Sequence, residues 1–190
     1  MMRILIFGCI GLGVLSMLNT SCKPKQVAPK EDFTFKHYQS ISLDLGDSLV
    51  QFNLSENPEK IETDLSKDYY WFKIDKITRT QGQYGGKLLD GEYKVVNQKD
   101  KSVMSKGAFD EGLMSGRWVS WYPNGKIKEV YTYKKGVKDG EYLLQNSLGQ
   151  ILEKGSFTKG RLEGLREYYG EDTVLMTIKY KKGIPVDTIP

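Results

Sequence analysis

The sequence predicts an all-β protein, a single elongated antiparallel β-meander built from stacked hairpins. Three observations lead to this fold class. A pattern of aromatic residues and glycines recurs along the second half of the chain, turn dipeptides separate short strand-like segments, and no window of about eleven residues shows helical periodicity. The 12 tyrosines and 20 glycines also fit strands that are broken by tight turns.

Residues 1–21 are expected to be a secretory signal. Arg3 precedes a continuous apolar stretch from Ile4 to Leu18, and a basic start before a short apolar run is typical of such signals. As a helix this stretch would span roughly 22 Å, which is short of the ~30 Å hydrocarbon core of a bilayer. An uncleaved membrane helix is the alternative interpretation.

The segment that ends in Ser21-Cys22 resembles the bacterial lipoprotein signal, although Asn19 stands where that family has an aliphatic residue and Leu18 lies one position earlier. The resemblance implies cleavage before Cys22 and a covalent lipid on Cys22. It therefore places the protein at the bacterial cell envelope, anchored to a membrane on the non-cytoplasmic side. Residues 22–36 are then predicted to be a polar, proline-spaced tether.

The overall composition excludes several classes of protein. Its 28 basic and 24 acidic residues nearly balance, so no nucleic-acid partner is expected. Aromatic residues make up 12% of the chain, which argues against disorder. Of the two cysteines, Cys9 lies in the predicted signal, so lipidated Cys22 would leave neither a disulfide nor a free thiol.

One pattern recurs in the second half of the chain: an aromatic residue, two polar residues, glycine, three residues, glycine, one residue and a second aromatic. From Phe109 onward, the first aromatic residues of successive copies are 24, 24 and 23 positions apart. Arg166 replaces the second aromatic residue in one copy, and Tyr168 follows it two positions later. The copies are Tyr84–Tyr93, Phe109–Trp118, Tyr133–Tyr142, Phe157–Arg166 and the truncated Tyr180–Gly183, and their turn glycines are Gly91, Gly112, Gly116, Gly136, Gly140, Gly160, Gly164 and Gly183.

This spacing resembles the MORN repeat in its bacterial variant form, over roughly half of the chain. The resemblance implies stacked β-hairpins of about 24 residues each, and bacterial members of this family are often labelled antitoxins. Residues 84–187 are accordingly assigned to a repeat array. Residues 37–83 are assigned to an N-terminal β region, either an eroded repeat or a cap over the end of the sheet.

Within one repeat the residues predict a hairpin. Strand-like residues 117–122 are followed by Pro123-Asn124-Gly125-Lys126, and Asn-Gly is the strongest short hairpin signal. Residues 127–133 then alternate as a second strand, and residues 134–139 are expected to turn the chain into the next copy. Gly112, Gly136 and Gly160 are expected to hold positive φ, and about ten strands are expected in the sheet.

The region before the repeats also has strand character. Ile41, Leu43 and Leu45 alternate with polar residues, Gly46-Asp47 predicts a turn, and residues 49–54 predict the returning strand. Residues 69–74 are aromatic-rich and predict another strand, whereas residues 59–67 are expected to form a short helix.

No catalytic, metal or cofactor site is predicted. His37 is the one histidine, so neither a zinc site nor a Ser–His–Asp triad has enough candidates. The glycines of residues 86–91 have phosphate-loop spacing, but Glu92 and Tyr93 follow in place of lysine and a hydroxyl residue. Apart from the lipid, we therefore expect no cofactor and no enzymatic activity.

The function expected from these residues is that of a membrane-anchored interaction or scaffold protein with a protein partner. Two alternatives remain: an antitoxin-like protein that neutralises a toxin, and an envelope lipoprotein that binds glycans through exposed aromatic rings. The aromatic residues either form a structural ladder or provide a ligand platform. The candidate interaction surface consists of Trp118, Trp121, Tyr122, Tyr142 and Tyr168.

Overall fold

A computed structural model describes residues 38–55, 61–171 and 173–189. They belong to the second of two units of the chain, Phe35–Pro190. The predicted signal, Cys22, the tether and His37 lie outside the described residues.

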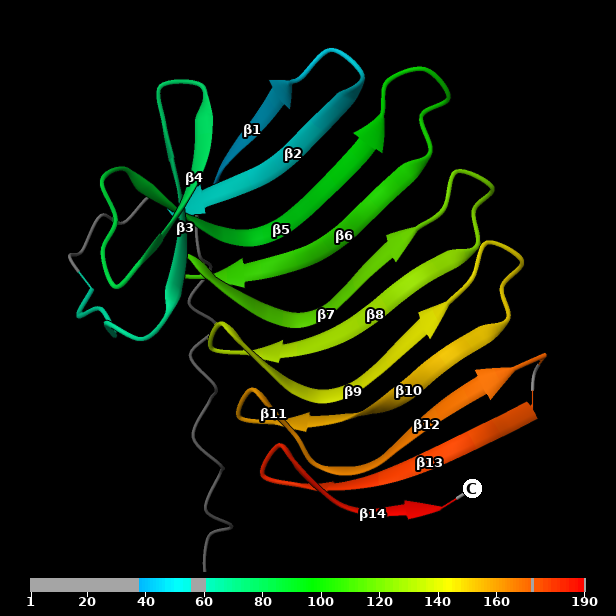
Figure 1. Cartoon of the computed structure of the whole chain (residues 1–190). Helices are drawn as coiled ribbons and strands as arrows, with labels where there is room; N and C mark the ends of the chain where they lie inside the picture. Colours follow the sequence, from blue (N-terminus) through cyan, green and yellow to red (C-terminus); the bar gives the residue numbers. More distant parts are fainter. Residues whose placement is uncertain (1–37, 56–60, 172, 190) are drawn as a thin grey trace, which may run out of the picture. The chain divides into compact units, whose positions relative to one another are not determined.

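The described residues form one open antiparallel sheet of fourteen strands with no helix, which confirms the predicted all-β meander (Figure 1). The sheet has more strands than the ten or so expected, because the N-terminal strands join it. The strands are β1 (Tyr38–Asp44), β2 (Ser48–Ser55), β3 (Asp68–Lys73), β4 (Lys76–Gln81), β5 (Lys87–Asn97), β6 (Val103–Asp110), β7 (Leu113–Trp121), β8 (Ile127–Lys134), β9 (Val137–Gln145), β10 (Ile151–Thr158), β11 (Arg161–Leu162), β12 (Gly164–Gly170), β13 (Thr173–Lys181) and β14 (Ile184–Ile189).

From β5 onward, successive strands pair in sequence order apart from the short β11, which pairs with β10. Before that point, β5 divides its pairing between two partners. Its first residues pair with β3, as Trp71 does with Leu88, and the rest pair with β2, from Leu54 opposite Leu89 to Ser48 opposite Asn97. The β3–β4 hairpin therefore leaves the path of the meander at the beginning of β5 (Figure 1).

The corners that join one repeat to the next are two-residue turns in which both central residues have positive φ, as in type I′ turns. Lys135 and Gly136 have φ values of +50° and +82°, and the pairs Glu111-Gly112, Lys159-Gly160 and Lys182-Gly183 share this conformation. The predicted positive φ at Gly112, Gly136 and Gly160 is confirmed. The predicted turn over residues 134–139 was too long, because a primed turn follows the strand twist and lets β9 begin at Val137.

The second glycine of each repeat lies inside a strand or at its first residue. Gly140 has a φ of +124°, and the ladder between β8 and β9 shifts register there, between Tyr131 and Tyr133. Such a bulge bends its strand and increases the local twist. Figure 1 shows β7, β9 and β12 curving near their first residues.

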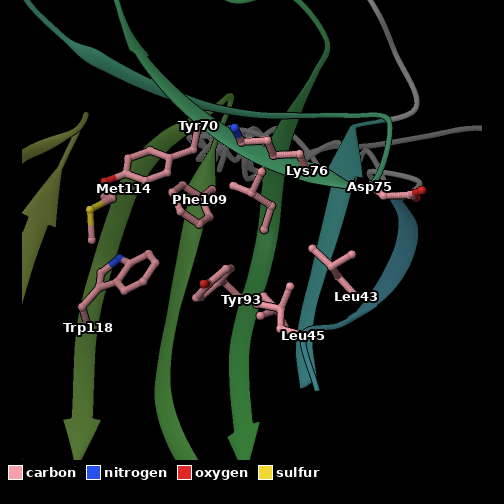
Figure 2. Close-up of a pocket in the computed structure, with 11 residues that line it drawn as sticks. Leu43, Leu45, Tyr70, Asp75, Lys76, Tyr93, Phe109, Met114 and Trp118 are labelled. Carbon is pink, nitrogen blue, oxygen red and sulfur yellow. The ribbon is translucent and has the colours of Figure 1, made fainter. Parts of the chain in front are cut away.

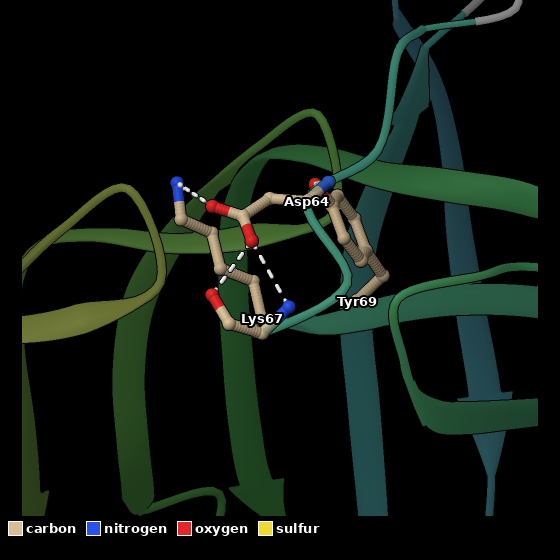
Figure 3. A network of polar contacts seen from close by, with 4 residues as sticks. Asp64, Lys67 and Tyr69 are labelled. Atoms are coloured by element: carbon tan, nitrogen blue, oxygen red, sulfur yellow. Dashed lines mark hydrogen bonds and ion pairs between the residues drawn. The ribbon is translucent and has the colours of Figure 1, made fainter.

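The prediction of a short helix at residues 59–67 is wrong for residues 61–67, the part that the structure describes, because these residues form coil and a turn. The Asp64 carboxylate accepts hydrogen bonds from the Ser66 backbone N–H at 2.9 Å and the Ser66 hydroxyl at 2.6 Å. It also pairs with Lys67, and the Asp64 N–H donates to the Tyr69 hydroxyl (Figure 3). These local side-chain bonds compete with helical hydrogen bonds for the same backbone groups.

The main core lies where the β3–β4 hairpin packs on the sheet. Phe72 of the hairpin is 5.2 Å from Phe52 between ring centroids, and Tyr70 is 4.9 Å from Phe109. The cluster of buried apolar residues beneath them consists of Val50, Phe52, Leu54, Leu89 and Phe109. The strand predicted at residues 69–74 is thus confirmed, and it covers one face of β2, β5 and β6.

Candidate functional site

One face of the sheet carries a row of aromatic side chains, and we call it the aromatic face. Cross-strand pairing places Trp118 of β7 opposite Tyr131 of β8, and Tyr131 opposite Tyr142 of β9. The rings of Tyr131 and Tyr142 stack with centroids 5.6 Å apart and planes 13° apart. Tyr93 and Phe109 extend the row toward the hairpin. The sequence predicts such a ladder as one of its two roles for these rings.

A polar cluster adjoins the row on β10 and β12. The Glu153 carboxylate accepts hydrogen bonds from the Tyr142 hydroxyl at 2.6 Å and from Arg166 Nε at 3.0 Å and Nη2 at 2.9 Å. Burial would raise the pKa of Glu153, but the bonds from Arg166 and Tyr142 outweigh it and lower that pKa. The hydrogen bond to Glu153 also raises the pKa of Arg166, and this effect exceeds the opposing effect of burial. The cluster therefore holds a fixed ion pair with defined side-chain geometry.

Two cations lie on aromatic rings of this face. Lys138 Nζ is 3.3 Å from the ring centroid of Tyr131 and 5.2 Å from that of Phe157. Burial lowers the pKa of Lys138, against the opposing effect of Glu129 and Glu153. Arg166 similarly lies 4.8 Å from the ring centroid of Tyr168. The open faces of these rings are thus already in contact with cations from the same chain.

Between the β3–β4 hairpin and the aromatic face lies a cavity of about 320 Å³ (Figure 2). Its wall is mostly apolar, and its two charged residues, Asp75 and Lys76, lie at the turn of the hairpin. No local pattern in the sequence predicts this cavity, because its wall combines four separate segments of the chain. The lining residues are Leu43, Leu45, Val50, Tyr70, Asp75, Lys76, Ile77, Tyr93, Phe109, Met114 and Trp118.

One of the residues that line this cavity, Trp118, has a polar atom without a partner. The indole N–H of Trp118 is buried and has no hydrogen-bond acceptor among the described residues. Figure 2 shows the indole nitrogen on the side of the ring toward Met114. By contrast, the Trp71 indole N–H donates to the Thr80 hydroxyl at 2.8 Å. Buried donors are almost always paired, so the packing of Trp118 is unusual.

The structure brings together only part of the candidate interaction surface. Trp118, Tyr142 and Tyr168 lie on the aromatic face, the first in the cavity wall and the second almost fully buried. Trp121 lines a hollow on the opposite face together with Val119. Successive side chains of a strand point to opposite faces, and Val119 follows Trp118 directly.

The fifth candidate, Tyr122, lies just after β7 and donates a hydrogen bond to the Gln145 carbonyl at 2.9 Å. Lys138, Glu153 and Arg166 were missing from the sequence-based candidates. Arg166 carried the one available signal, because it takes the place of an aromatic residue in the repeat pattern.

The opposite face has a more polar hollow of about 660 Å³ over β7–β12. Lys154 and Glu167, which form an ion pair of 3.0 Å, line it together with Arg117 and Glu141. Both partners of that pair are substantially solvated, so it contributes little stability.

In the described part of the chain, no group of three or more His, Cys, Asp or Glu side chains is arranged to hold a metal ion. A search of the same residues finds no helix with the length and hydropathy needed to span a bilayer. No family model matches the chain, and no curated protein matches it.

Proposed function

We propose that the protein is a non-catalytic interaction module, tethered to the envelope membrane through lipid on Cys22, that binds a protein partner on the aromatic face over β8–β13. The observation that carries this proposal is the preformed set of tyrosines and cations around Glu153. The lipid anchor rests on the signal-like sequence that ends at Cys22.

The position of the cluster supports a docking role. The β3–β4 hairpin packs against β5 and β7, whereas from β9 to β13 the described strands contact mainly their neighbours in the sheet. Tyrosine and arginine dominate the energetic centres of protein interfaces, because they combine large contact areas with directional hydrogen bonds. Ion pairs and cation–π contacts that already exist in the free protein also reduce the entropy lost on binding.

The same contacts favour a protein over a glycan as the partner. A sugar-binding platform needs an open ring face, but Lys138 lies on Tyr131 and Arg166 lies on Tyr168. Tyr142 is only 4% exposed. The resemblance to bacterial MORN-variant repeats agrees with a protein partner, and toxin neutralisation would be a special case of such binding.

Adjacent tyrosines on β12 provide a matched test. Tyr168 lies on the aromatic face beside Arg166, whereas Tyr169 lies on the opposite face with Lys154 and Glu167. A photocrosslinking amino acid, p-benzoylphenylalanine, would be placed at either position in cells that express the full chain. We expect a discrete protein adduct from position 168, its loss in Arg166→Glu, and no such adduct from position 169.

Equal adducts from both positions, or adducts from position 169 alone, would contradict the assignment of the partner to the aromatic face. Circular dichroism of the purified variants would check that each retains its β-sheet. Arg166→Glu places its new carboxylate beside that of Glu153. The double variant Glu153→Arg/Arg166→Glu reverses the ion pair, and it would show whether a restored pair also restores the adduct.

A further inference from the structure

We propose that a row of basic residues along one end of the strands binds an acidic polysaccharide. Three successive corners, those of β8–β9, β10–β11 and β13–β14, lie along this end of the sheet (Figure 1). The site is separate from the aromatic face and does not depend on the lipid anchor. We call it the basic row, and it consists of Lys134, Lys135, Lys159, Arg161, Lys181 and Lys182.

The charges of the basic row are open to a ligand. All six residues are exposed, and in the described part of the chain none of them forms an ion pair. Two acidic residues, Asp139 and Glu163, lie beside the same corners but are less exposed. The Glu163 carboxylate accepts a hydrogen bond from the Lys182 backbone N–H at 2.8 Å. These corners therefore present an excess of positive charge to a ligand.

The corners hold these charges at a regular interval. Neighbouring corners are two strands apart, which at the usual strand spacing is about 9–10 Å, so the three corners span about 19 Å. The Gly160 N–H donates to the Lys138 carbonyl, and the Gly183 N–H donates to the Leu162 carbonyl, each at 2.8 Å. These bonds fix each corner to the hairpin before it. A linear ligand with one negative charge per interval can thus meet all three corners.

Lysine is strained at all three corners. Lys135, Lys159 and Lys182 have φ values of +50°, +51° and +53°. A residue with a β-carbon is unfavourable in this region, and asparagine before glycine is the preferred sequence of such turns. Because the strained lysine recurs at three successive corners, we attribute it to a requirement for charge rather than for stability.

The composition of the basic row favours a polysaccharide over a protein or a nucleic acid. Protein interfaces are depleted in lysine and enriched in aromatic residues, and residues 134–136, 158–161 and 181–183 include no aromatic residue. Duplex DNA carries one charge per about 1.7 Å of its axis, which is far denser than six cations over about 19 Å. An extended glycan with an acidic sugar at every second position has its charges about one corner interval apart.

A flat anionic membrane fits this end of the sheet less well than a linear ligand does. The preceding corner, between β6 and β7, lies at the same end of the strands and carries Asp110 and Glu111, both exposed. A planar surface that touched every corner would meet these carboxylates as well as the lysines, and like charges repel. A linear ligand can follow the three basic corners alone.

The test uses the full chain in nanodiscs of neutral phosphatidylcholine and fluorescently labelled oligosaccharides. The hexasaccharide of hyaluronan has a carboxylate on every second sugar, so it offers three charges to three corners. The hexamer of N-acetylglucosamine is an uncharged chain of the same number of sugars. Fluorescence anisotropy should show saturable binding of the hyaluronan hexasaccharide that weakens as salt is added, and no binding of the neutral hexamer.

The triple variant Lys135→Asn/Lys159→Asn/Lys182→Asn removes three charges and relieves three strained positions, so it should fold at least as well as the parent chain. It should bind the hyaluronan hexasaccharide about 10-fold more weakly, at roughly a factor of two for each exposed charge.

The matched control is Lys99→Asn/Lys101→Asn/Lys126→Asn. It removes the same charge from the turns at the other end of the strands, and Lys101 also has a positive φ. This control should leave the affinity for the hexasaccharide unchanged, because these lysines lie away from the basic row.

Failure of the hyaluronan hexasaccharide to bind, or an equal loss of affinity in the two triple variants, would overturn the proposal. Stronger displacement of the labelled hexasaccharide by hexaglutamate than by unlabelled hexasaccharide would overturn it in favour of a protein ligand. Preferential binding of phosphatidylglycerol vesicles, lost in the first triple variant, would overturn it in favour of a membrane. Arg166→Glu should leave hexasaccharide binding unaltered, so failure of the protein-interaction proposal is distinguishable from failure of this one.

Discussion

The indole ring of Trp118 lies directly over the backbone of Gly107, on the neighbouring strand β6. A β-carbon on Gly107 would come within 2.2 Å of Trp118 Cδ2, and other ring atoms would follow at 2.3 and 2.6 Å. Gly107 is not among the glycines with positive φ, so ring packing rather than backbone conformation requires glycine here. Tyr142 lies over Gly155 in a similar way, and its Cε1 is 2.9 Å from the position that a β-carbon would occupy there.

Gly107→Ala is therefore expected to destabilise the protein by about 1–3 kcal/mol, the usual cost of overpacking a well-packed site. Urea unfolding followed by tryptophan fluorescence would measure the change. The same substitution in a Trp118→Leu background should cost clearly less, because the flat ring that excludes the methyl group is gone. An identical cost in both backgrounds would contradict the packing explanation.

Lys135→Asn should stabilise the protein by about 0.5–1 kcal/mol, since Lys135 holds a φ of +50° and asparagine tolerates this region better than lysine. The substitution would also place an Asn-Gly pair at this corner, together with Gly136, which is the preferred sequence of a type I′ turn. Lys134→Asn is the control, because Lys134 ends β8 and has no positive φ. Thermal unfolding should show a higher midpoint for Lys135→Asn alone.

The Glu153–Arg166 pair predicts a specific pH dependence of stability. Because the folded state lowers the pKa of Glu153, the pair contributes stability above the unfolded pKa, near 4.5, and loses it as the pH falls through the lower folded value. In Arg166→Gln, the rise that burial causes in the pKa of Glu153 is opposed mainly by the Tyr142 hydrogen bond. The loss of stability at acid pH should therefore shrink or reverse in sign. Unfolding free energies measured from pH 3 to pH 7 would distinguish the two proteins.

At neutral pH, Arg166→Gln should cost about 1–3 kcal/mol, because the Glu153 side chain is only 15% exposed and would lose two charge-assisted hydrogen bonds. The double variant Glu153→Gln/Arg166→Gln should recover part of that loss, since no unpaired carboxylate then remains. Urea unfolding would measure the two single variants, Arg166→Gln and Glu153→Gln, and the double variant. If the losses of the two single variants simply add in the double variant, the pairing is not the source of the effect.

Cys22→Ala should release the protein from the membrane fraction if lipid on Cys22 is its anchor. Cell fractionation followed by immunoblotting would measure this, with Cys9→Ala as the matched control that leaves the predicted lipidation site intact. Retention of Cys22→Ala in the membrane fraction would contradict the lipid anchor and favour the uncleaved apolar helix.

Local sequence signals predicted the hairpins well. Asn124-Gly125 lies in the turn between β7 and β8, and Gly136 and Gly160 hold positive φ at the corners. These features depend on residues close together in the chain, because φ preferences and strand alternation are local properties. The Asp64 turn escaped prediction because a side chain competed for the backbone groups that a helix would have used.

The grouping of side chains into sites depended on register. Glu153 follows a register shift between β9 and β10 at Ile151, and this shift places it on the aromatic face beside Tyr142 and Arg166. A displacement of one residue would have moved the carboxylate to the opposite face, and sequence spacing alone does not locate such a bulge. The same alternation separates Trp118 from Trp121, although the two lie only three positions apart.

By itself, the sequence determined that this chain forms antiparallel hairpins with glycine-containing corners, because those choices are made by neighbouring residues and their backbone preferences. Only the tertiary structure decided that the β3–β4 hairpin folds onto the aromatic face and leaves a half-open cavity beside Trp118. That arrangement brings Leu43, Tyr70 and Met114 together from distant parts of the chain. Burial of apolar surface drives such packing. Its free energy is roughly proportional to the buried area and does not depend on direction, so the sequence does not show which apolar segments will meet.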